Sequence, residues 1–548
     1  MSKIEHPIWP LGLFLKFFTP LARHEMYQFE NEYTWGKAVA NNSTDEFHAK
    51  FDNAVDKVRK ELGKKYPAII NGKEIFSDDC FTVRSPSDTH ISVAQFPKTH
   101  EDEIHDSIFS AKEAFANWSN VPYQKRAETF QDCADVFSER KFFLAAIMTF
   151  ENGKNRIESM GDIDEAIDFM RFYAFQLEKN EGFSRHTVHP NPNEKTQTIM
   201  KPFGVWGIIA PFNFPSAIAI GMTTGALITG NTAILKPSSD APLSSFQFAK
   251  ILYPKIPDGA INLVTGSGSI IGKALIESPS VDGIAFTGSH KVGRSGFKTF
   301  TKTSSKPFIS EMGGKNPVIV TKNADLEKAS NGVMNAAFGF GGQKCSACSR
   351  VYVQNEVADE FISKLVEKTK KLKIGMPWQK ETFLGPVINN NAKIKFENAV
   401  SSAKKDGKIL AGGTVLTAPN FENGYFVEPT IVAKLSEDHN LMKEELFLPL
   451  LCVQRYENFD DAIDLANQTE YGLTAGIFSE DKKQLDDFLR KIQAGVVYTN
   501  RSASATTAAL VSSQPFVGWK NSGSSGKGAG GENYLQQFMR TQTQTRCD

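Results

Sequence analysis

The sequence predicts an α/β protein of two or more domains, with mostly parallel sheets that helices cover on both faces. At 548 residues the chain is several times longer than one domain of roughly 100–200 residues. From residue 205 onward, continuous apolar segments of strand length alternate with helical segments. Uninterrupted apolar strands are typical of parallel sheets that are buried on both faces.

Composition and charge exclude several functional classes. Hydrophobic residues make up 41% of the chain and charged residues 23%, which is ordinary for globular proteins and excludes wholesale disorder. The 62 basic residues balance 62 acidic ones, so a strongly basic nucleic-acid-binding protein is not expected. The six cysteines are scattered, which favours a reducing cytoplasm over a disulfide framework.

The N-terminal part is predicted to be helical. Residues 11–22 are apolar but too short to span a membrane, so we expect a packed segment and no membrane partner. Apolar side chains recur at helical spacing in later segments. These segments are residues 45–63 (with Gly63 as a C-terminal cap), 103–118, 127–151 and 165–179. A polar, alternating stretch at 185–200 with a Pro-Asn-Pro-Asn centre predicts a β-hairpin.

A repeated strand–helix pattern follows. Residues 205–210 and 231–236 are predicted strands, and a PFNFP turn and a helix to about residue 230 separate them. Three further helices (243–253, 270–277 and 291–302) alternate with the strands INLV, GIAF and PFIS. A second α/β block begins at NPVIV (316–320), with helices at 326–338 and 358–372, and runs to about residue 522. Ligands of such sheets bind where the strands end, so the loops after the strands are the expected binding region.

Several of these loops have the composition of a dinucleotide site. Gly266, Gly268 and Gly272 form a G-x-G-x-x-x-G turn, which alone also fits an ordinary strand-to-helix turn. Gly288 and Ser289 open the next helix, where backbone N–H groups and a hydroxyl suit a pyrophosphate. The remaining candidate is Lys236, which ends a strand and could bind a ribose hydroxyl.

Cys345 is the candidate nucleophile. It lies in GGQKCSACSR, a glycine-rich turn that we expect to enter a helix, so that Lys344 and the helix dipole lower the thiol pKa. Three alternatives stay open: a buried inert cysteine, a redox pair with Cys348, and a zinc ligand. Zinc would need a second ligand pair, which the dispersed histidines do not supply, so no metal is expected.

Glu311 ends a strand just before two glycines. The alternative is a solvated charge, but Ile309, Met312 and Val318 around it are apolar. A buried carboxylate with a raised pKa suits a general base.

Taken together, the motifs PFNFP, ILKPS, FTGS, EMGGKNP, GQKCSACSR, KEELF and QPF, in this order, resemble the aldehyde dehydrogenase superfamily from about residue 66 to 539. GQKCSACSR together with AGGENYLQQF resembles one subfamily, the 1-pyrroline-5-carboxylate dehydrogenases. The resemblance implies a Rossmann-type cofactor domain (1–183 and 203–313), an α/β catalytic domain (314–521) and a β oligomerisation arm (184–202 and 522–548). It also implies a homo-oligomer.

The catalytic roles follow from the same resemblance. Cys345 would be the nucleophile, Asn213 the oxyanion donor and Glu311 the base. The thiolate would attack the aldehyde carbon, hydride transfer to the cofactor would leave a thioester, and Glu311 would activate water to hydrolyse it.

The cofactor implied is NAD, with NADP open because Ser239 stands where NAD-preferring relatives carry Glu. The cofactor-binding positions are Phe212, Lys236, Ser239, Gly268, Gly272, Gly288, Ser289, Glu445 and Phe447.

The substrate implied is a small aldehyde, L-glutamate 5-semialdehyde, oxidised to glutamate in proline breakdown. The substrate-binding positions are Phe214, Ser346, Ala508, Ala509 and Phe516. Ala508 and Val517 replace family glycines, and Leu448, at a third such position, is expected to add bulk beside the nicotinamide contact. The alternatives are an aldehyde dehydrogenase for another aldehyde and a catalytically silent dinucleotide-binding protein.

Overall fold

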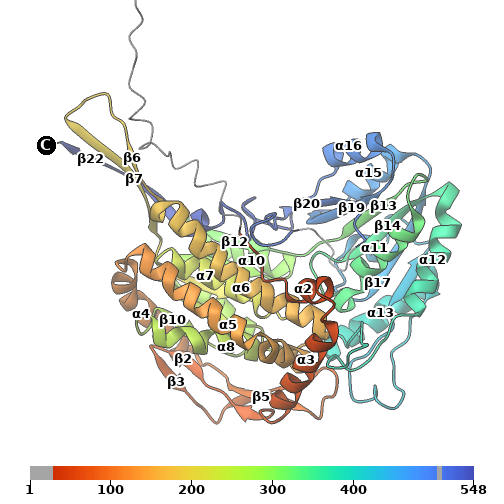
Figure 1. Cartoon of the computed structure of the whole chain (residues 1–548), viewed down its shortest axis with the longest axis horizontal. Coiled ribbons are helices and arrows are strands. Elements are labelled where there is room, and N and C mark those ends of the chain that lie inside the picture. The colour runs from red at the N-terminus through yellow and green to blue at the C-terminus, as the bar shows by residue number, and fades with distance from the viewer. Residues whose placement is uncertain (1–28, 503–508, 548) are drawn as a thin grey trace, which may run out of the picture.

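The structure, a computed structural model, describes residues 29–502 and 509–547. Two α/β blocks lie side by side, and a narrow arm of strands projects from the first of them (Figure 1). The predicted α/β class with mostly parallel sheets is confirmed. The apolar run at 11–22 lies outside the described residues. Within the described part of the chain, no helix is long and apolar enough to cross a bilayer.

The first block contains a seven-stranded sheet in the order β12-β11-β8-β9-β10-β2-β3. The five strands from β12 to β10 are parallel, while β2 and β3 run antiparallel to their neighbours. The strands are β2 (Ala68–Ile70), β3 (Lys73–Ile75), β8 (Val205–Ile209), β9 (Thr232–Lys236), β10 (Ile261–Leu263), β11 (Gly283–Thr287) and β12 (Phe308–Glu311).

Helices cover both faces of this sheet. They are α4 (Glu101–Ser119), α5 (Tyr123–Glu151), α6 (Arg156–Lys179), α7 (Ala217–Ile228), α8 (Pro242–Leu252), α9 (Gly268–Glu277) and α10 (His290–Phe300). Successive side chains of a strand point to opposite faces, so each strand contributes to two cores. On β8, Val205 packs with side chains of α4 and α9, whereas Trp206 packs with those of α5 to α8.

The second block repeats the arrangement, with strand order β15-β16-β17-β14-β13-β19-β20 and only β15 antiparallel. The strands are β13 (Asn316–Val320), β14 (Cys348–Gln354), β15 (Lys408–Ala411), β16 (Thr430–Ala433), β17 (Leu450–Tyr456), β19 (Thr474–Phe478) and β20 (Val496–Thr499). The helices are α11 (Leu326–Phe338), α12 (Ala358–Lys370), α13 (Asn390–Asp406), α14 (Asn440–Lys443), α15 (Phe459–Asn467) and α16 (Lys482–Lys491).

Smaller elements surround the two sheets. Near the N-terminus, α2 (Thr34–Ala40) and α3 (Thr44–Arg59) pack on the first block, and β1, β5 and β4 form a small sheet beside it. The remaining bounds are β1 (Lys64–Lys65), β4 (Cys80–Arg84), β5 (Ser92–Pro97), β18 (Tyr471–Gly472) and β21 (Trp519–Lys520).

The predicted hairpin is confirmed and acquires a third strand. β6 (Ser184–Thr187) pairs with β7 (Glu194–Pro202), and β22 (Met539–Cys547) pairs with the other edge of β7 over nine residues. Figure 1 shows these strands projecting away from the helices. Their role in oligomerisation and the domain boundaries given above stay predictions.

Most predicted helices and strands are confirmed within a few residues. The largest difference is the helix predicted at 165–179, because α6 already begins at Arg156. The first predicted helix is also shorter, since α3 ends at Arg59 and residues 60–62 form turns before Gly63. Gly63 has a φ of 78°, so it does end this segment in the left-handed region. The loops after β8, β9, β10 and β11 meet at the carboxyl edge of the first sheet, as predicted.

Candidate functional site

Cys345 lies in a sharp turn between a 3-10 turn (η3, Gly339–Gly342) and β14. Phe340, Gly341 and Gly342 all have positive φ. A Cβ on Gly342 would lie 2.3 Å from the carbonyl oxygen of Leu448, so only glycine fits there. The Asn316 amide donates to the carbonyl oxygens of Cys345 (2.7 Å) and Ala347, which fixes the turn against β13.

The Cys345 sulfur is half-buried and lies near two acidic side chains. Burial, together with the negative charges of Glu445 and Glu311, raises the pKa of the thiol to about 12. The backbone N–H groups of Cys345 and Ser346 point to the sulfur and act in the opposite direction.

The expectation that Lys344 and a helix dipole lower this pKa is therefore wrong. Lys344 forms an ion pair with Glu158 (Nζ to Oε1, 3.0 Å) instead of facing the thiol. The chain after Cys345 continues into β14, a strand, which has little net dipole at its end.

Glu311 is the last residue of β12. Its Oε2 is buried and has no hydrogen-bond partner among the described residues, while the Gly518 N–H points to the carboxyl group. Burial raises the pKa of Glu311 well above its ordinary value, as the apolar neighbours Ile309 and Met312 predict. Such a carboxyl keeps its proton to a higher pH than an ordinary glutamate does.

Glu445 can lie close to this site because the two glycines next to it, Gly313 and Gly314, have no side chains. A Cβ on Gly313 would lie 2.1 Å from the Glu445 carboxylate, and a Cβ on Gly314 would lie 2.8 Å from the carbonyl oxygen of Cys345. The Gly314 N–H donates to Oε1 of Glu445 (3.1 Å). Burial raises the pKa of Glu445 to about 7. The glycines of EMGGKNP therefore allow Glu445 and the Cys345 turn to approach each other.

Asn213 lies in the PFNFP loop (211–215) between β8 and α7 and is 3% exposed. The ring of its neighbour Phe212 meets that of Phe447 edge-on, with centroids 5.8 Å apart. Phe447 belongs to the same segment as Glu445. Loops of the two blocks thus meet at Phe212 and Phe447, two of the expected cofactor-binding positions.

The glycine turn and Lys236 form the surface predicted for a dinucleotide. Gly266 has a φ of 138°, whereas Gly268 and Gly272 have room for a Cβ. The nearest atom to that position on Gly268 is the Lys236 Nζ at 3.6 Å. Bare backbone beside a buried lysine suits a close-lying phosphate or ribose. Ser239 instead donates its hydroxyl to the Gly266 carbonyl (2.6 Å), so it supports this turn.

Two aliphatic side chains beside this surface were not predicted from the sequence. Ile270 on α9 and Val292 on α10 are 57% and 53% exposed, on helices that contact each other. Ser289 is the exposed N-cap residue of α10, next to Gly288. Exposed aliphatic groups can cover the faces of a flat base. The available signal was an apolar residue in the first turn of the helix after each glycine-serine loop.

The expected substrate-binding positions differ in their surroundings. Ser346 is buried, and its carbonyl accepts a hydrogen bond from Thr474. Phe516 pairs with Ala529 through two backbone hydrogen bonds of 2.9 Å. Phe214 and Ala509 are half-buried, and Ala508 lies outside the described residues.

The side chain of Leu448 does not lie where the sequence predicted. Its side chain is buried in the core of the second block with Leu446 and Leu450. The extra bulk is accommodated by that core, so the expectation of crowding beside the nicotinamide contact is wrong.

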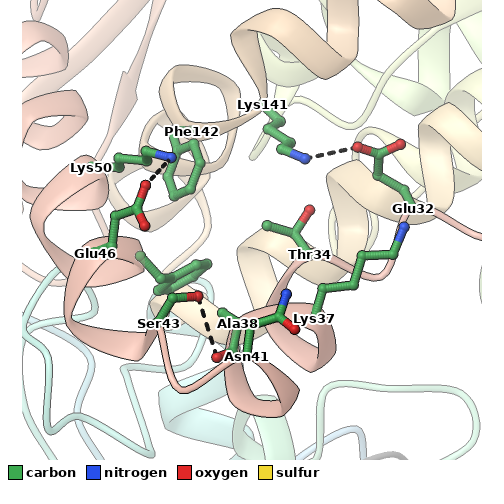
Figure 2. Close-up of a pocket in the computed structure, with 11 residues that line it drawn as sticks. Glu32, Thr34, Lys37, Ala38, Asn41, Ser43, Glu46, Lys50, Lys141 and Phe142 are labelled. Carbon is green, nitrogen blue, oxygen red and sulfur yellow. Dashed lines mark hydrogen bonds and ion pairs between the residues drawn. The ribbon is translucent and has the colours of Figure 1, made fainter.

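A cavity of about 230 Å³ lies elsewhere, where α2 and α3 meet α5 (Figure 2). Its lysines already have carboxylate partners: Lys37 with Glu30, Lys50 with Glu46, and Lys141 with Glu32. None of the predicted site residues lines it. Within the described residues, no cluster of three His, Cys, Asp or Glu side chains could hold a metal ion.

Comparisons with known proteins agree with this geometry. The aldehyde dehydrogenase family matches residues 75–544. Proteins named 1-pyrroline-5-carboxylate dehydrogenase from a Geobacillus species (strain WCH70) and from Bacillus cytotoxicus are 37% and 38% identical over 500 residues, which cover 90% of this chain and 95% of each relative.

Solved structures show the same fold. The 1-pyrroline-5-carboxylate dehydrogenase from Thermus with bound NAD has a TM-score of 0.88 at 31% identity and covers 95% of this chain and 99% of that one. The betaine aldehyde dehydrogenase from Staphylococcus aureus in complex with NAD+ has a TM-score of 0.84 at 28% identity, over 91% of this chain and 97% of that one.

The raised thiol pKa predicts how Cys345 reacts with iodoacetamide in the free protein. Because the thiolate is the reactive form and the pKa is about 12, alkylation should be slow at pH 7 and should accelerate beyond pH 10. In Glu311→Gln, alkylation at alkaline pH should be faster, since one negative charge that raises this pKa is gone. Mass spectrometry of the Cys345 peptide measures both rates, with Glu356→Gln as a control. A rate that levels off near pH 7 would contradict this prediction.

Proposed function

The chain belongs to the aldehyde dehydrogenase family, and we propose that it oxidises L-glutamate 5-semialdehyde to L-glutamate in proline breakdown, with NAD as the hydride acceptor. The observation that carries the chemistry is the Cys345 sulfur, which lies within the electrostatic reach of both Glu311 and Glu445. The choice of substrate is supported by relatives named 1-pyrroline-5-carboxylate dehydrogenase at 36–38% identity.

The residues at the proposed cofactor site fit NAD. Open backbone at Gly268 and Gly272 beside Lys236 leaves space for the pyrophosphate and ribose. We propose that Glu445, whose Oε1 accepts the Gly314 N–H, accepts hydrogen bonds from the ribose hydroxyls. Bound NAD supplies the acceptor for the hydride that leaves the substrate carbon.

The chain's own residues supply the other steps. The Cys345 thiol gives its proton to solvent and its sulfur bonds to the aldehyde carbon, while the carbonyl oxygen becomes an oxyanion that the Asn213 amide and the Cys345 N–H hold. After oxidation to the thioester, Glu311 takes a proton from water as the water oxygen bonds to the carbonyl carbon. The C–S bond then breaks, which releases the acid and returns the Cys345 thiolate. The buried, unpartnered oxygen of Glu311 suits this proton transfer.

The first test separates the nucleophile from its neighbour. Cys345→Ala should abolish aldehyde-dependent NADH formation and leave the Kd for NAD nearly unchanged. Cys348→Ala should stay active, because Cys348 is buried in the core of the second block and its Sγ contacts the Arg350 carbonyl. Steady-state assays and NAD titrations measure both effects. Equal loss in the two folded variants would indicate a dithiol mechanism instead.

The second test separates the two half-reactions. Glu311→Gln should give a pre-steady-state burst of NADH followed by slow turnover, because hydride transfer precedes deacylation. In the wild type, the rate of the slow phase should rise with pH over a range above that in which an ordinary glutamate titrates, since burial raises the pKa of this base. Stopped-flow absorbance measures both phases. A first turnover slowed as much as the later ones would assign Glu311 to an earlier step.

The third test concerns the substrate carboxylate. We propose that neutral donors, Ser346 and the backbone of the loop at 507–509, bind the amino-acid end of the substrate. Ser346→Ala should then raise KM for the semialdehyde by roughly one to two orders of magnitude, about 1.5–3 kcal/mol for a hydrogen bond to a charged group. The KM for propanal, which lacks a carboxylate, should hardly change. If both substrates suffer alike, Ser346 supports Cys345 and does not read the substrate.

We also propose that the projecting strands β6, β7 and β22 form the contact between subunits of a homo-oligomer. A projecting sheet leaves backbone groups at its edges that a second copy could pair with. Deletion of residues 539–548 should lower the mass measured by light scattering to that of a smaller assembly. An unchanged mass would show that the contact lies elsewhere.

A further inference from the structure

We propose that the buried ion pair between Lys154 and Asp162 positions the PFNFP loop, and with it Asn213, against the Cys345 turn. Lys154 lies in the short connection between α5 and α6, and Asp162 lies on α6. Neither belongs to the residue set assigned above to catalysis or binding. The inference rests on the proposed role of Asn213 as the oxyanion donor.

The PFNFP loop is held from several sides. The Asn152 amide donates to the Phe212 carbonyl (3.1 Å), and the Ser245 hydroxyl donates to the Pro215 carbonyl (2.7 Å). The Oδ1 of Asp162 accepts the N–H of Ala217, the first residue of α7, at 2.7 Å. The backbone on both sides of Asn213 is therefore fixed by this region.

Lys154 connects this loop to the nucleophile turn. Its Nζ lies 2.8 Å from Oδ2 of Asp162 and 3.5 Å from the ring centroid of Phe214. The same ammonium lies 5.2 Å from the ring centroid of Phe340, which precedes Cys345 by five residues. The Lys154 ammonium thus contacts both the residue after Asn213 and the turn that presents the Cys345 sulfur. Both contacts are cation–π interactions, which require the cation to lie over the face of the ring.

Stability alone gives little reason for this pair. Both side chains are fully buried. Burial lowers the pKa of Lys154 and raises that of Asp162, against the effect of their pairing, so desolvation outweighs the attraction. Apolar or neutral pairs of similar volume often stabilise a core equally well. The location of the pair between the PFNFP loop and the Cys345 turn explains its presence better.

The test is a double-mutant cycle on the rate of the NADH burst. Lys154→Met/Asp162→Asn removes both charges, keeps the volume and leaves an amide oxygen that can accept from Ala217. We expect the burst to slow about 10- to 100-fold, less than the roughly 10²–10³-fold for loss of a whole oxyanion donor. In an Asn213→Ala background, the same double substitution should slow the burst by less than about twofold, because residues that act through one group are not additive.

A matched control is the pair Lys141–Glu32, which is 2.7 Å apart and largely buried but lies near α2. Lys141→Met/Glu32→Gln should leave the burst rate and the Kd for NAD unchanged. If the Lys154/Asp162 variant does not fold, Asn152→Ala is tested in the same cycle. It should slow the burst by less than the double substitution in the wild-type background, and by less than about twofold in the Asn213→Ala background.

The proposal is overturned if the double substitution slows the burst equally in the wild-type and Asn213→Ala backgrounds, or if it leaves the burst rate unchanged. It is also overturned if the Kd for NAD rises in proportion to the loss of burst rate. The cycle is measured with propanal as well as the semialdehyde. A wild-type protein that oxidises propanal but not the semialdehyde would refute the proposed substrate and leave the cycle readable.

Discussion

The site depends on one tight crossing between the two sheets, residues 312–315, which join β12 to β13. Glu311 precedes this crossing and Asn316 follows it, so the proposed base and the residue that holds the Cys345 turn are five positions apart in the chain. The crossing can bring them together because Gly313 and Gly314 carry no side chains. Any Cβ there would overlap the Glu445 carboxylate or approach the Cys345 carbonyl within 2.8 Å.

Burial sets the chemistry of the groups that meet there. The pKa values of Cys345, Glu311 and Glu445 are all raised, with desolvation as the largest cause in each case. A thiol with so high a pKa is protected from adventitious oxidation and alkylation at neutral pH. Loss of a nearby negative charge would lower this pKa and favour the thiolate.

A second group of buried charges lies behind the PFNFP loop. The Glu151 carboxylate accepts hydrogen bonds from the backbone of Ser244 (3.0 Å) and Leu243 at the start of α8, as Asp162 does at the start of α7. Carboxylates at helix N-termini are favourable because the unpaired N–H groups and the helix dipole meet a negative charge. The end of α5 and the start of α6 thus anchor α7, which follows the PFNFP loop, and α8, which follows Lys236 and Ser239.

The sequence by itself determined the class of the fold and most of its elements, because apolar periodicity and glycine punctuation are local properties of the chain. It also identified Cys345 and Glu311 as candidates from their neighbouring residues, and Asn213 through the family resemblance, since the motifs of that resemblance are compact and ordered along the chain. The sequence could not determine the partner of Lys344, which is Glu158 on a distant helix, and so the expected lowering of the thiol pKa was wrong. The burial of Leu448, the exposure of Ile270 and Val292, and the contact of Lys154 with Phe214 were likewise decided only by the tertiary structure. Each depends on which segments pack together, and desolvation and charge pairing arise only from such long-range contacts.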